Sequence, residues 1–188
     1  MAAESPDSPF DREVLCLIGY RGTGKTSVAQ ELANRIGWNW IDSDHVIEED
    51  AGRTIAAIFA EDGEDGFRAL EEAAVKAVLG VPGRVVSVGG GAVLREANRR
   101  CMAERAAVVW LKAEPETILA RLNSDVATAS QRPNLTADGG LQEIQFLLQQ
   151  RGPLYCECAD LEVDTEGKDV ATVATEILDR IHSTSDGA

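Results

Sequence analysis

The chain has 188 residues, about the length of one domain, and 44% of them are hydrophobic, which is enough to form a buried core. Its 18 basic and 32 acidic residues leave a net charge of −14, which repels a nucleic-acid backbone or an anionic membrane. No apolar run approaches the roughly 18 residues of a membrane span, and the acidic start of the chain is unlike a signal peptide. We therefore expect a cytoplasmic protein that binds neither nucleic acid nor membranes. We also expect a monomer, although composition does not determine the oligomeric state.

The N-terminal half alternates short apolar strands with helices. Residues 1–12 predict a flexible tail, and VLCLIG (14–19) is an unbroken apolar run, typical of a strand buried on both faces of a parallel sheet. A helical pattern over 26–36 follows and ends at Gly37, a residue that commonly caps helices at their carboxyl end. The next predicted elements are a strand over 38–42, helices near 44–51, 54–60 and 64–80, and a strand over 84–88.

The second half continues the alternation. Its predicted elements are helices over 95–105, 115–123 and 140–150, strands over 106–111 and 160–164, a turn at GPLY (152–155), and a closing helix over 169–182. Residues 123–138 lose periodicity and collect Ser, Thr, Asp and Asn, which predicts a mobile lid, and 183–188 predict a second tail. Five strands with intervening helices favour one doubly wound α/β domain over 13–182, whose ligands bind at the carboxyl ends of the strands.

A phosphate-binding motif follows the first strand directly. GYRGTGKT has the pattern G-x-x-x-x-G-K-[ST], with Gly19, Gly24, Lys25 and Thr26 in register, and a predicted helix comes next. Glycines let successive backbone N–H groups surround a phosphate, and the helix N-terminus adds positive potential. The lysine can reach the β- and γ-phosphates, and the hydroxyl can ligate Mg²⁺. The motif predicts a nucleoside triphosphate but does not say what receives the phosphoryl group.

Two features after later strands point to an acceptor. IDSD places Asp42 and Asp44 two residues apart, so that in extended backbone both carboxylates lie on one side. One could hold the water shell of a metal and the other accept a hydroxyl proton; alternatively, Asp42 or Ser43 only caps the following helix. Three glycines at 89–91 follow the third strand and would allow close approach of a ligand, although a simple turn explains them as well.

Arginines are the candidate cationic groups for binding an acidic ligand, and the sequence offers few other reactive side chains. Arg68, Arg132 and Arg151 could each fork onto a carboxylate or phosphate, but an isolated arginine is more often only solvated. The two histidines, His45 and His182, are far apart in sequence, which argues against a Ser-His-Asp triad or a metal hydrolase. The four cysteines lack zinc-site spacing and predict reduced thiols.

Taken in order, GYRGTGKT, IDSD, GFRALE, VGGGAV, RP, RGPLY and DLEVDT resemble the shikimate kinase family, over about residues 14–181. The resemblance implies a three-layer P-loop kinase fold like that of the nucleoside monophosphate kinases, with a five-stranded parallel sheet in the order 2-3-1-4-5. It implies Mg²⁺-dependent transfer of a phosphoryl group from ATP to the 3-hydroxyl of shikimate, giving shikimate 3-phosphate and ADP in the chorismate pathway of aromatic amino-acid biosynthesis.

The resemblance also assigns roles on the nucleotide side. Thr26 and Asp42 would hold Mg²⁺, Arg121 would lie against adenine and Lys168 near the adenine loop. The residues expected to contact the ATP phosphates are Gly22, Thr23, Gly24, Lys25, Thr26 and Ser27. Arg132 would belong to the lid and touch the transferred phosphoryl group, so that Lys25, Asp44 and Arg132 are the expected catalytic residues.

On the acceptor side, the resemblance implies that Asp44 holds the shikimate hydroxyls and acts as base. Arg68 and Arg151 would fork onto the shikimate carboxylate, and Gly90 would donate its backbone N–H nearby. The lid departs from the family pattern, since it reads RPNL where RPLL is common and is longer than in compact members. Thr26 replaces a common serine and keeps the hydroxyl.

Two other functions stay open from the sequence. A gluconate kinase of the same fold would share the phosphate loop but would not need Arg68 and Arg151 as a pair. A nucleotide-binding module without turnover would keep the loop but has no need of Asp44 and Arg132. An assay of ADP release with several acceptors separates these possibilities.

Overall fold

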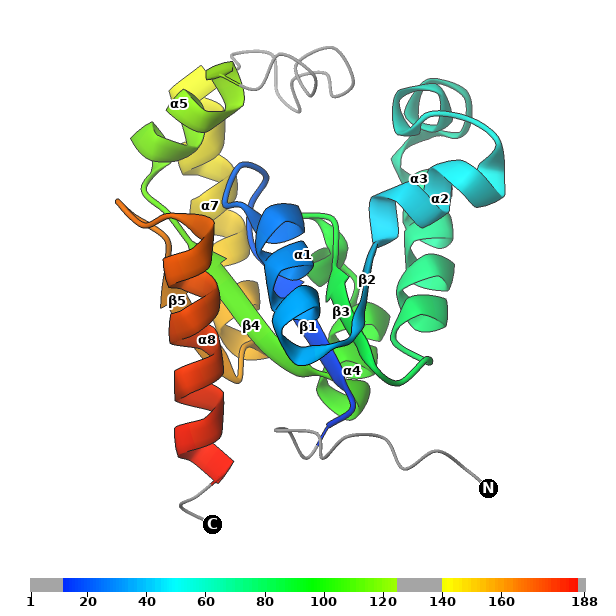
Figure 1. Ribbon diagram of the computed structural model, residues 1–188. Helices are drawn as coiled ribbons and strands as arrows, with labels where there is room; N and C mark the ends of the chain where they lie inside the picture. The colour runs from blue at the N-terminus through cyan, green and yellow to red at the C-terminus, as the bar shows by residue number, and fades with distance from the viewer. Residues whose placement is uncertain (1–11, 125–139, 186–188) are drawn as a thin grey trace, which may run out of the picture.

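The computed structural model describes residues 12–124 and 140–185 as an α/β domain around one parallel sheet (Figure 1). The sheet has the strand order β2-β3-β1-β4-β5, as the family resemblance implied. Its strands are β1 (Val14–Ile18), β2 (Asn39–Asp42), β3 (Arg84–Ser87), β4 (Ala107–Lys112) and β5 (Leu161–Asp164). All four strand pairings are parallel, so the carboxyl ends of the strands share one edge of the sheet.

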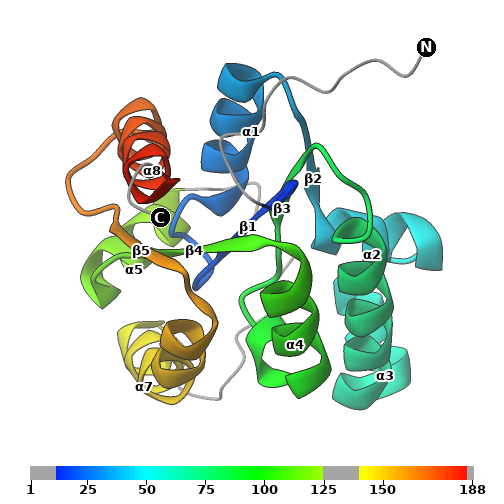
Figure 2. The ribbon, with the colours of Figure 1, turned by 90° about the horizontal axis from the view of Figure 1, so that it is seen from below.

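Helices cover both faces of this sheet, as Figure 2 shows. The helical elements, in chain order, are α1 (Lys25–Ile36), α2 (Ser43–Ala51), α3 (Ile55–Val78), the 3₁₀ turn η1 (Ala92–Leu94), α4 (Glu96–Arg105), α5 (Pro115–Ser124), α7 (Gly140–Cys158) and α8 (Val170–Ser185). Helix α8 ends at Ser185, beyond the boundary at 182 expected from sequence. None of the helices within 12–124 and 140–185 is long and apolar enough to cross a bilayer.

The alternation of side chains along β1 divides the core into two clusters. Leu15 and Leu17 face α1 and α8, whereas Cys16 and Ile18 face α3, α4 and α7. All five residues of β1 are buried, which explains why its sequence is continuously apolar. The four cysteines are free thiols, as expected.

Two glycines bear on the predicted helix boundaries. The two helices predicted over 54–60 and 64–80 lie within one element, α3, and are separated as predicted by a kink at Gly63, where the backbone is non-helical with φ of 71°. The predicted turn at GPLY is wrong, because α7 continues through Pro153 to Cys158. Gly152 precedes that proline and has no Cβ to clash with its ring. Burial of Arg151 and Tyr155 on the same helix stabilises the continued helix.

Candidate active site

The phosphate loop joins β1 to α1 at the carboxyl edge of the sheet. Gly19, Gly22 and Gly24 have φ values of 136°, 82° and 90°, which residues with a Cβ rarely adopt. A Cβ on Gly19 would also collide with the carbonyl oxygen of Leu111 in β4. The glycines predicted from the motif are therefore required by both the loop's conformation and its packing.

Lys25 begins α1 and is largely buried, with 9% of its surface exposed. Its Nζ donates to the carbonyl oxygens of Gly19 (2.8 Å) and Tyr20 (2.9 Å), which fold the side chain back across the loop. Thr23 is buried and donates its hydroxyl to Tyr20 O (2.8 Å), so its side chain holds the loop in shape. A contact between Thr23 and ATP would therefore use the backbone N–H.

Asp42 links the loop to the second strand. Its Oδ2 accepts a hydrogen bond from the Thr26 hydroxyl (2.9 Å), and its Oδ1 accepts one from the backbone N–H of Asp44 (3.0 Å). The second bond caps the N-terminus of α2, so Asp42 is the cap of this helix, but its contact with Thr26 shows that it does more than cap. Mg²⁺ binds through oxygen ligands, often one or two protein groups with waters and substrate phosphates, and this hydroxyl–carboxylate pair fits that donor set.

The three glycines after β3 are tightly surrounded by charged side chains. A Cβ on Gly89 would lie 2.6 Å from Asp44 Oδ1 and 3.1 Å from Glu71 Oε1. A Cβ on Gly91 would lie 2.5 Å from one guanidinium nitrogen of Arg68. The triple glycine is therefore a close-contact surface and more than a turn, because it lets these side chains from α2 and α3 approach the end of β3.

Arg68 and Glu71 form a buried ion pair on α3. The distance from Arg68 Nη1 to Glu71 Oε2 is 2.7 Å, and the two side chains are 8% and 1% exposed. Burial raises the pKa of the Glu71 carboxyl, and the Arg68 guanidinium opposes that shift. Arg68 also donates to Glu64 Oε1 at the exposed edge of the helix (3.3 Å). The arginine is thus held in place, as a group that binds a carboxylate through a fork should be.

Arg151 reaches the same glycines from the opposite helix. Its Nη1 donates to Gly90 O (3.3 Å), and Tyr155, one turn later on α7, donates its hydroxyl to the same oxygen (2.6 Å). Both side chains are buried, and burial raises the pKa of Tyr155 to about 12. The structure therefore brings Arg68 and Arg151 to adjacent residues of one glycine segment.

Of the two residues expected near adenine, one lines the cavity and the other does not. Arg121 donates to Thr165 Oγ1 (3.0 Å), Thr165 O (2.9 Å) and Gly22 O (3.4 Å), and it lines the cavity. Lys168 instead pairs with Glu176 (2.6 Å) and donates to Asp164 O. Lys168 is absent from the described residues that line the cavity, so its contact with nucleotide stays a prediction.

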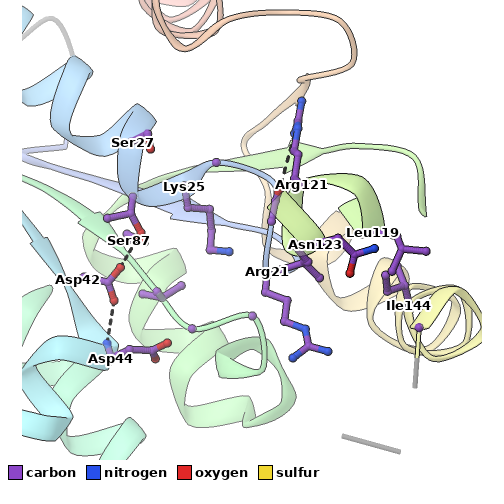
Figure 3. Close-up of a pocket in the computed structure, with 18 residues that line it drawn as sticks. Arg21, Lys25, Ser27, Asp42, Asp44, Ser87, Leu119, Arg121, Asn123 and Ile144 are labelled. Carbon is purple, nitrogen blue, oxygen red and sulfur yellow. Dashed lines mark hydrogen bonds between the residues drawn. The ribbon is translucent and has the colours of Figure 1, made fainter. Parts of the chain in front are cut away.

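A cavity of about 470 Å³ lies at the carboxyl edge of the sheet, and its described lining includes Gly89 and Gly90 but not the side chains of Arg68 and Arg151. Figure 3 shows Lys25, Asp42 and Asp44 at one side of it and Arg121, Asn123 and Ile144 at the other. Of the predicted site residues, the cavity is lined by Gly22, Gly24, Lys25, Thr26, Ser27, Asp42, Asp44, Gly90 and Arg121. Arg132 lies outside the described residues, as does most of the predicted lid.

Four site residues were not predicted from the sequence. Glu71 could have been noticed, since it stands three residues after Arg68 and so faces it across one helical turn. Arg21, Glu143 and Tyr155 carry no local signal of this kind, because their partners lie far away in the sequence. Arg21 pairs with Glu143 across 122 positions, with 2.7 Å between Nη2 and Oε1.

Comparison with known proteins agrees with this geometry. The sequence model of the shikimate kinase family matches residues 21–182. The chain is 45% identical to the shikimate kinase of Rhodopirellula baltica, over 87% of this chain and 88% of that protein. It is 42% identical to the shikimate kinase of Geobacter sulfurreducens, over 90% of this chain and 91% of that protein.

Solved structures give the same family. The structure of shikimate kinase from Acinetobacter baumannii in complex with shikimate superposes with a TM-score of 0.86 at 34% identity, covering 93% of this chain and 95% of that one. A gluconokinase from Sinorhizobium meliloti, at 18% identity and a TM-score of 0.58, shares the fold only. With a family match over most of its length and close relatives of similar size, the chain belongs to the shikimate kinase family.

Proposed function

We propose that this protein transfers the γ-phosphoryl group of ATP to the 3-hydroxyl of shikimate, giving shikimate 3-phosphate and ADP. The observation that carries the proposal is the glycine segment 89–91. It places a carboxylate, Asp44, against Gly89 and two buried arginines, Arg68 and Arg151, against Gly91 and Gly90, beside the phosphate loop. The acceptor pocket thus offers cations for a carboxylate and a base for a hydroxyl.

On the nucleotide side, the loop glycines and the start of α1 would bind the phosphates through backbone N–H groups. Lys25 would exchange its carbonyl acceptors for phosphate oxygens, and Ser27, in the first turn of α1, would add a hydroxyl. Thr26 and Asp42 would hold Mg²⁺, which when bound supplies positive charge beside the β- and γ-phosphates. Arg121 would lie beside the base of the nucleotide.

On the acceptor side, Arg68 and Arg151 would fork onto the shikimate carboxylate, and the Gly90 N–H would support them. Asp44 would accept a hydrogen bond from the 3-hydroxyl and take its proton as the new phosphorus–oxygen bond forms. Because phosphoryl transfer depends mainly on positioning and charge neutralisation, no nucleophilic side chain is needed. Arg132 would contribute charge from the lid.

An assay of ADP release with Mg-ATP tests the proposal when shikimate, gluconate, nucleoside monophosphates and no acceptor are compared. We expect release only with shikimate. Arg68→Lys keeps a cation beside Glu71 but removes the fork, so KM for shikimate should rise at least tenfold with KM for ATP unchanged. Arg53→Lys is the matched control, since Arg53 pairs with Glu61 and Asp62 on the surface.

Release with gluconate alone would refute the acceptor, and ATP binding without release to any acceptor would indicate a non-catalytic module. We also infer a cytoplasmic monomer, in keeping with the net charge of −14 and the reduced thiols. Size-exclusion chromatography with light scattering would test the monomer, for which a mass of 20.1 kDa is expected.

A further inference from the structure

A third cation of the cavity, Arg21, has no part in the function proposed above. It belongs to the phosphate loop, between Tyr20 and Gly22, and lines the cavity together with Lys25 and Asp44. In Figure 3 its side chain extends from the loop into the cavity, as that of Lys25 does. The guanidinium is therefore placed to meet a bound ligand.

The backbone at Arg21 lies on the acceptor side of the loop. A Cβ built on Gly90 would be 3.4 Å from the Arg21 backbone nitrogen and 3.3 Å from Gly19 O. Gly90 accepts hydrogen bonds from Arg151 and precedes Gly91, which contacts Arg68. Arg21 thus stands at the junction of the nucleotide loop and the acceptor pocket, where the phosphoryl group would pass.

The Arg21 guanidinium is held from behind by a buried carboxylate. Its Nη2 lies 2.7 Å from Oε1 of Glu143 on α7, and the two side chains are 17% and 0% exposed. A guanidinium has five N–H donors in a fixed plane. Arg21 donates to Glu143, its guanidinium lies 5.8 Å from the centre of the Tyr20 ring, and its Nε is buried without a hydrogen-bond partner among the described residues. The pair therefore fixes the plane of the fork and leaves donors for a ligand.

The other cations of the cavity are held by different parts of the structure. Among its described lining residues, the basic side chains are Arg21, Lys25 and Arg121. Arg121 is bonded to Thr165 at the far side of the loop, and Lys25 is bonded within the loop itself. Arg21 is tied to α7, the helix that also carries the acceptor-side Arg151.

We propose that Arg21 is a catalytic residue that donates hydrogen bonds to the phosphoryl group during its transfer, and that Glu143 is the positioning residue for its guanidinium. This inference rests on the function proposed above. In the step, the bond between the γ-phosphorus and the bridging oxygen breaks and its electron pair stays with ADP. A bond from phosphorus to the 3-oxygen of shikimate forms, and the hydroxyl proton moves to Asp44. Arg21 remains protonated and stabilises charge on the transferred oxygens.

The test compares Arg21→Gln, Arg21→Lys and Glu143→Gln with the wild type, and with Arg35→Gln as a surface control. Steady-state kinetics give kcat and both KM values, and calorimetry gives affinities for shikimate and for shikimate 3-phosphate. For Arg21→Gln we expect a loss in kcat of roughly 10²- to 10³-fold, as for loss of one oxyanion donor. Its affinity for shikimate 3-phosphate should fall at least tenfold, with its affinity for shikimate within threefold of wild type.

Arg21→Lys should recover part of the lost kcat, because it keeps the charge without the fork. Glu143→Gln should lower kcat about tenfold. In the double variant with Arg21→Gln, the fold loss in kcat should be smaller than the product of the two single losses, because the two residues act together. Arg35→Gln should match the wild type.

Several results would overturn the inference. One is a kcat for Arg21→Gln within threefold of wild type. Another is an equal loss of affinity for shikimate and for shikimate 3-phosphate in that variant. If Arg21→Gln does not fold, Arg21→Lys decides alone, and wild-type kcat and product affinity in that variant would refute the role. A wild-type enzyme without shikimate-dependent ADP release would overturn the proposed function and this inference together, whereas an active wild type beside an unaffected variant would overturn the inference only.

Discussion

Replacing Gly89 with alanine tests whether the glycine segment positions the catalytic carboxylate. The backbone of Gly89 lies outside the left-handed region, so alanine can adopt its conformation. The obstacle is contact, since the new Cβ would lie 2.6 Å from Asp44 Oδ1, where ordinary van der Waals contact begins at 3.4 Å. The carboxylate must therefore retreat by about 0.8 Å, and the new Cβ would also lie 3.1 Å from Glu71 Oε1, which is closer than ordinary contact.

A displacement of about 1 Å at a reacting group can cost roughly 10²-fold in rate. We therefore expect Gly89→Ala to lower kcat about 10²-fold, with the affinity for ATP unchanged because the atoms nearest to the new Cβ belong to Asp44 and Glu71 and not to the phosphate loop. Coupled ADP release with shikimate measures kcat, and calorimetry with a non-hydrolysable ATP analogue measures nucleotide affinity. A kcat within threefold of wild type would refute the reasoning.

Gly83→Ala is the matched control for loss of stability. Gly83 lies before β3 with φ of 69°, and a Cβ there would meet open space. Alanine in left-handed backbone costs about 1–2 kcal/mol, which lowers Tm by about 2–8 °C in a domain of this size. Its kcat should nevertheless equal that of the wild type. If Gly83→Ala lost activity as Gly89→Ala is expected to, general destabilisation would explain both variants.

Four further substitutions test other parts of the site. Asp44→Asn should abolish turnover with ATP binding intact, and wild-type kcat would remove its role as base. Thr26→Val removes the hydroxyl of the expected Mg²⁺ site, so the Mg²⁺ concentration for half-maximal rate should rise at least tenfold, and an unchanged Mg²⁺ titration would contradict that role. Arg132→Ala should lower kcat far more than it raises KM for shikimate, and a change in neither value would exclude the lid assignment. Tyr155→Phe removes the bond to Gly90 O, which should lower Tm by about 2–4 °C at pH 8 for a loss of about 1 kcal/mol. Because burial raises the pKa of Tyr155 from 10 to about 12, its stabilisation is complete below pH 10 and is lost as pH rises to 12. Thermal unfolding of the wild type should therefore weaken over that range more than that of the variant, and parallel curves would contradict the assignment.

The sequence alone predicted the features that depend on local pattern. The phosphate loop, the strand that precedes it and the Asp42–Asp44 pair are each written in a few consecutive residues, and the structure brings them together. The strand order came from family resemblance, since periodicity says nothing about which strands are neighbours.

Features that depend on distant partners could not be predicted. Glycine at 89 and 91 is explained by Asp44 and Arg68, which come from α2 and α3 and are unknown until the chain is folded. Helix α7 passes through Pro153 because its buried contacts outweigh the local preference for a turn. The ion pair between Lys168 and Glu176 on α8 likewise joins two residues whose proximity no local pattern shows, and the contact of Lys168 with nucleotide stays a prediction.

Helix α7 also determines where this chain can change in length. It carries Glu143, which contacts the phosphate loop, and Arg151 and Tyr155, which contact the glycine segment. One residue added or removed between them would turn the remainder of the helix by about 100° and shift it by about 1.5 Å. No single insertion or deletion there could keep both sets of contacts. Length variation among descendants of this sequence should therefore accumulate at the ends of elements and spare the interval from 143 to 155.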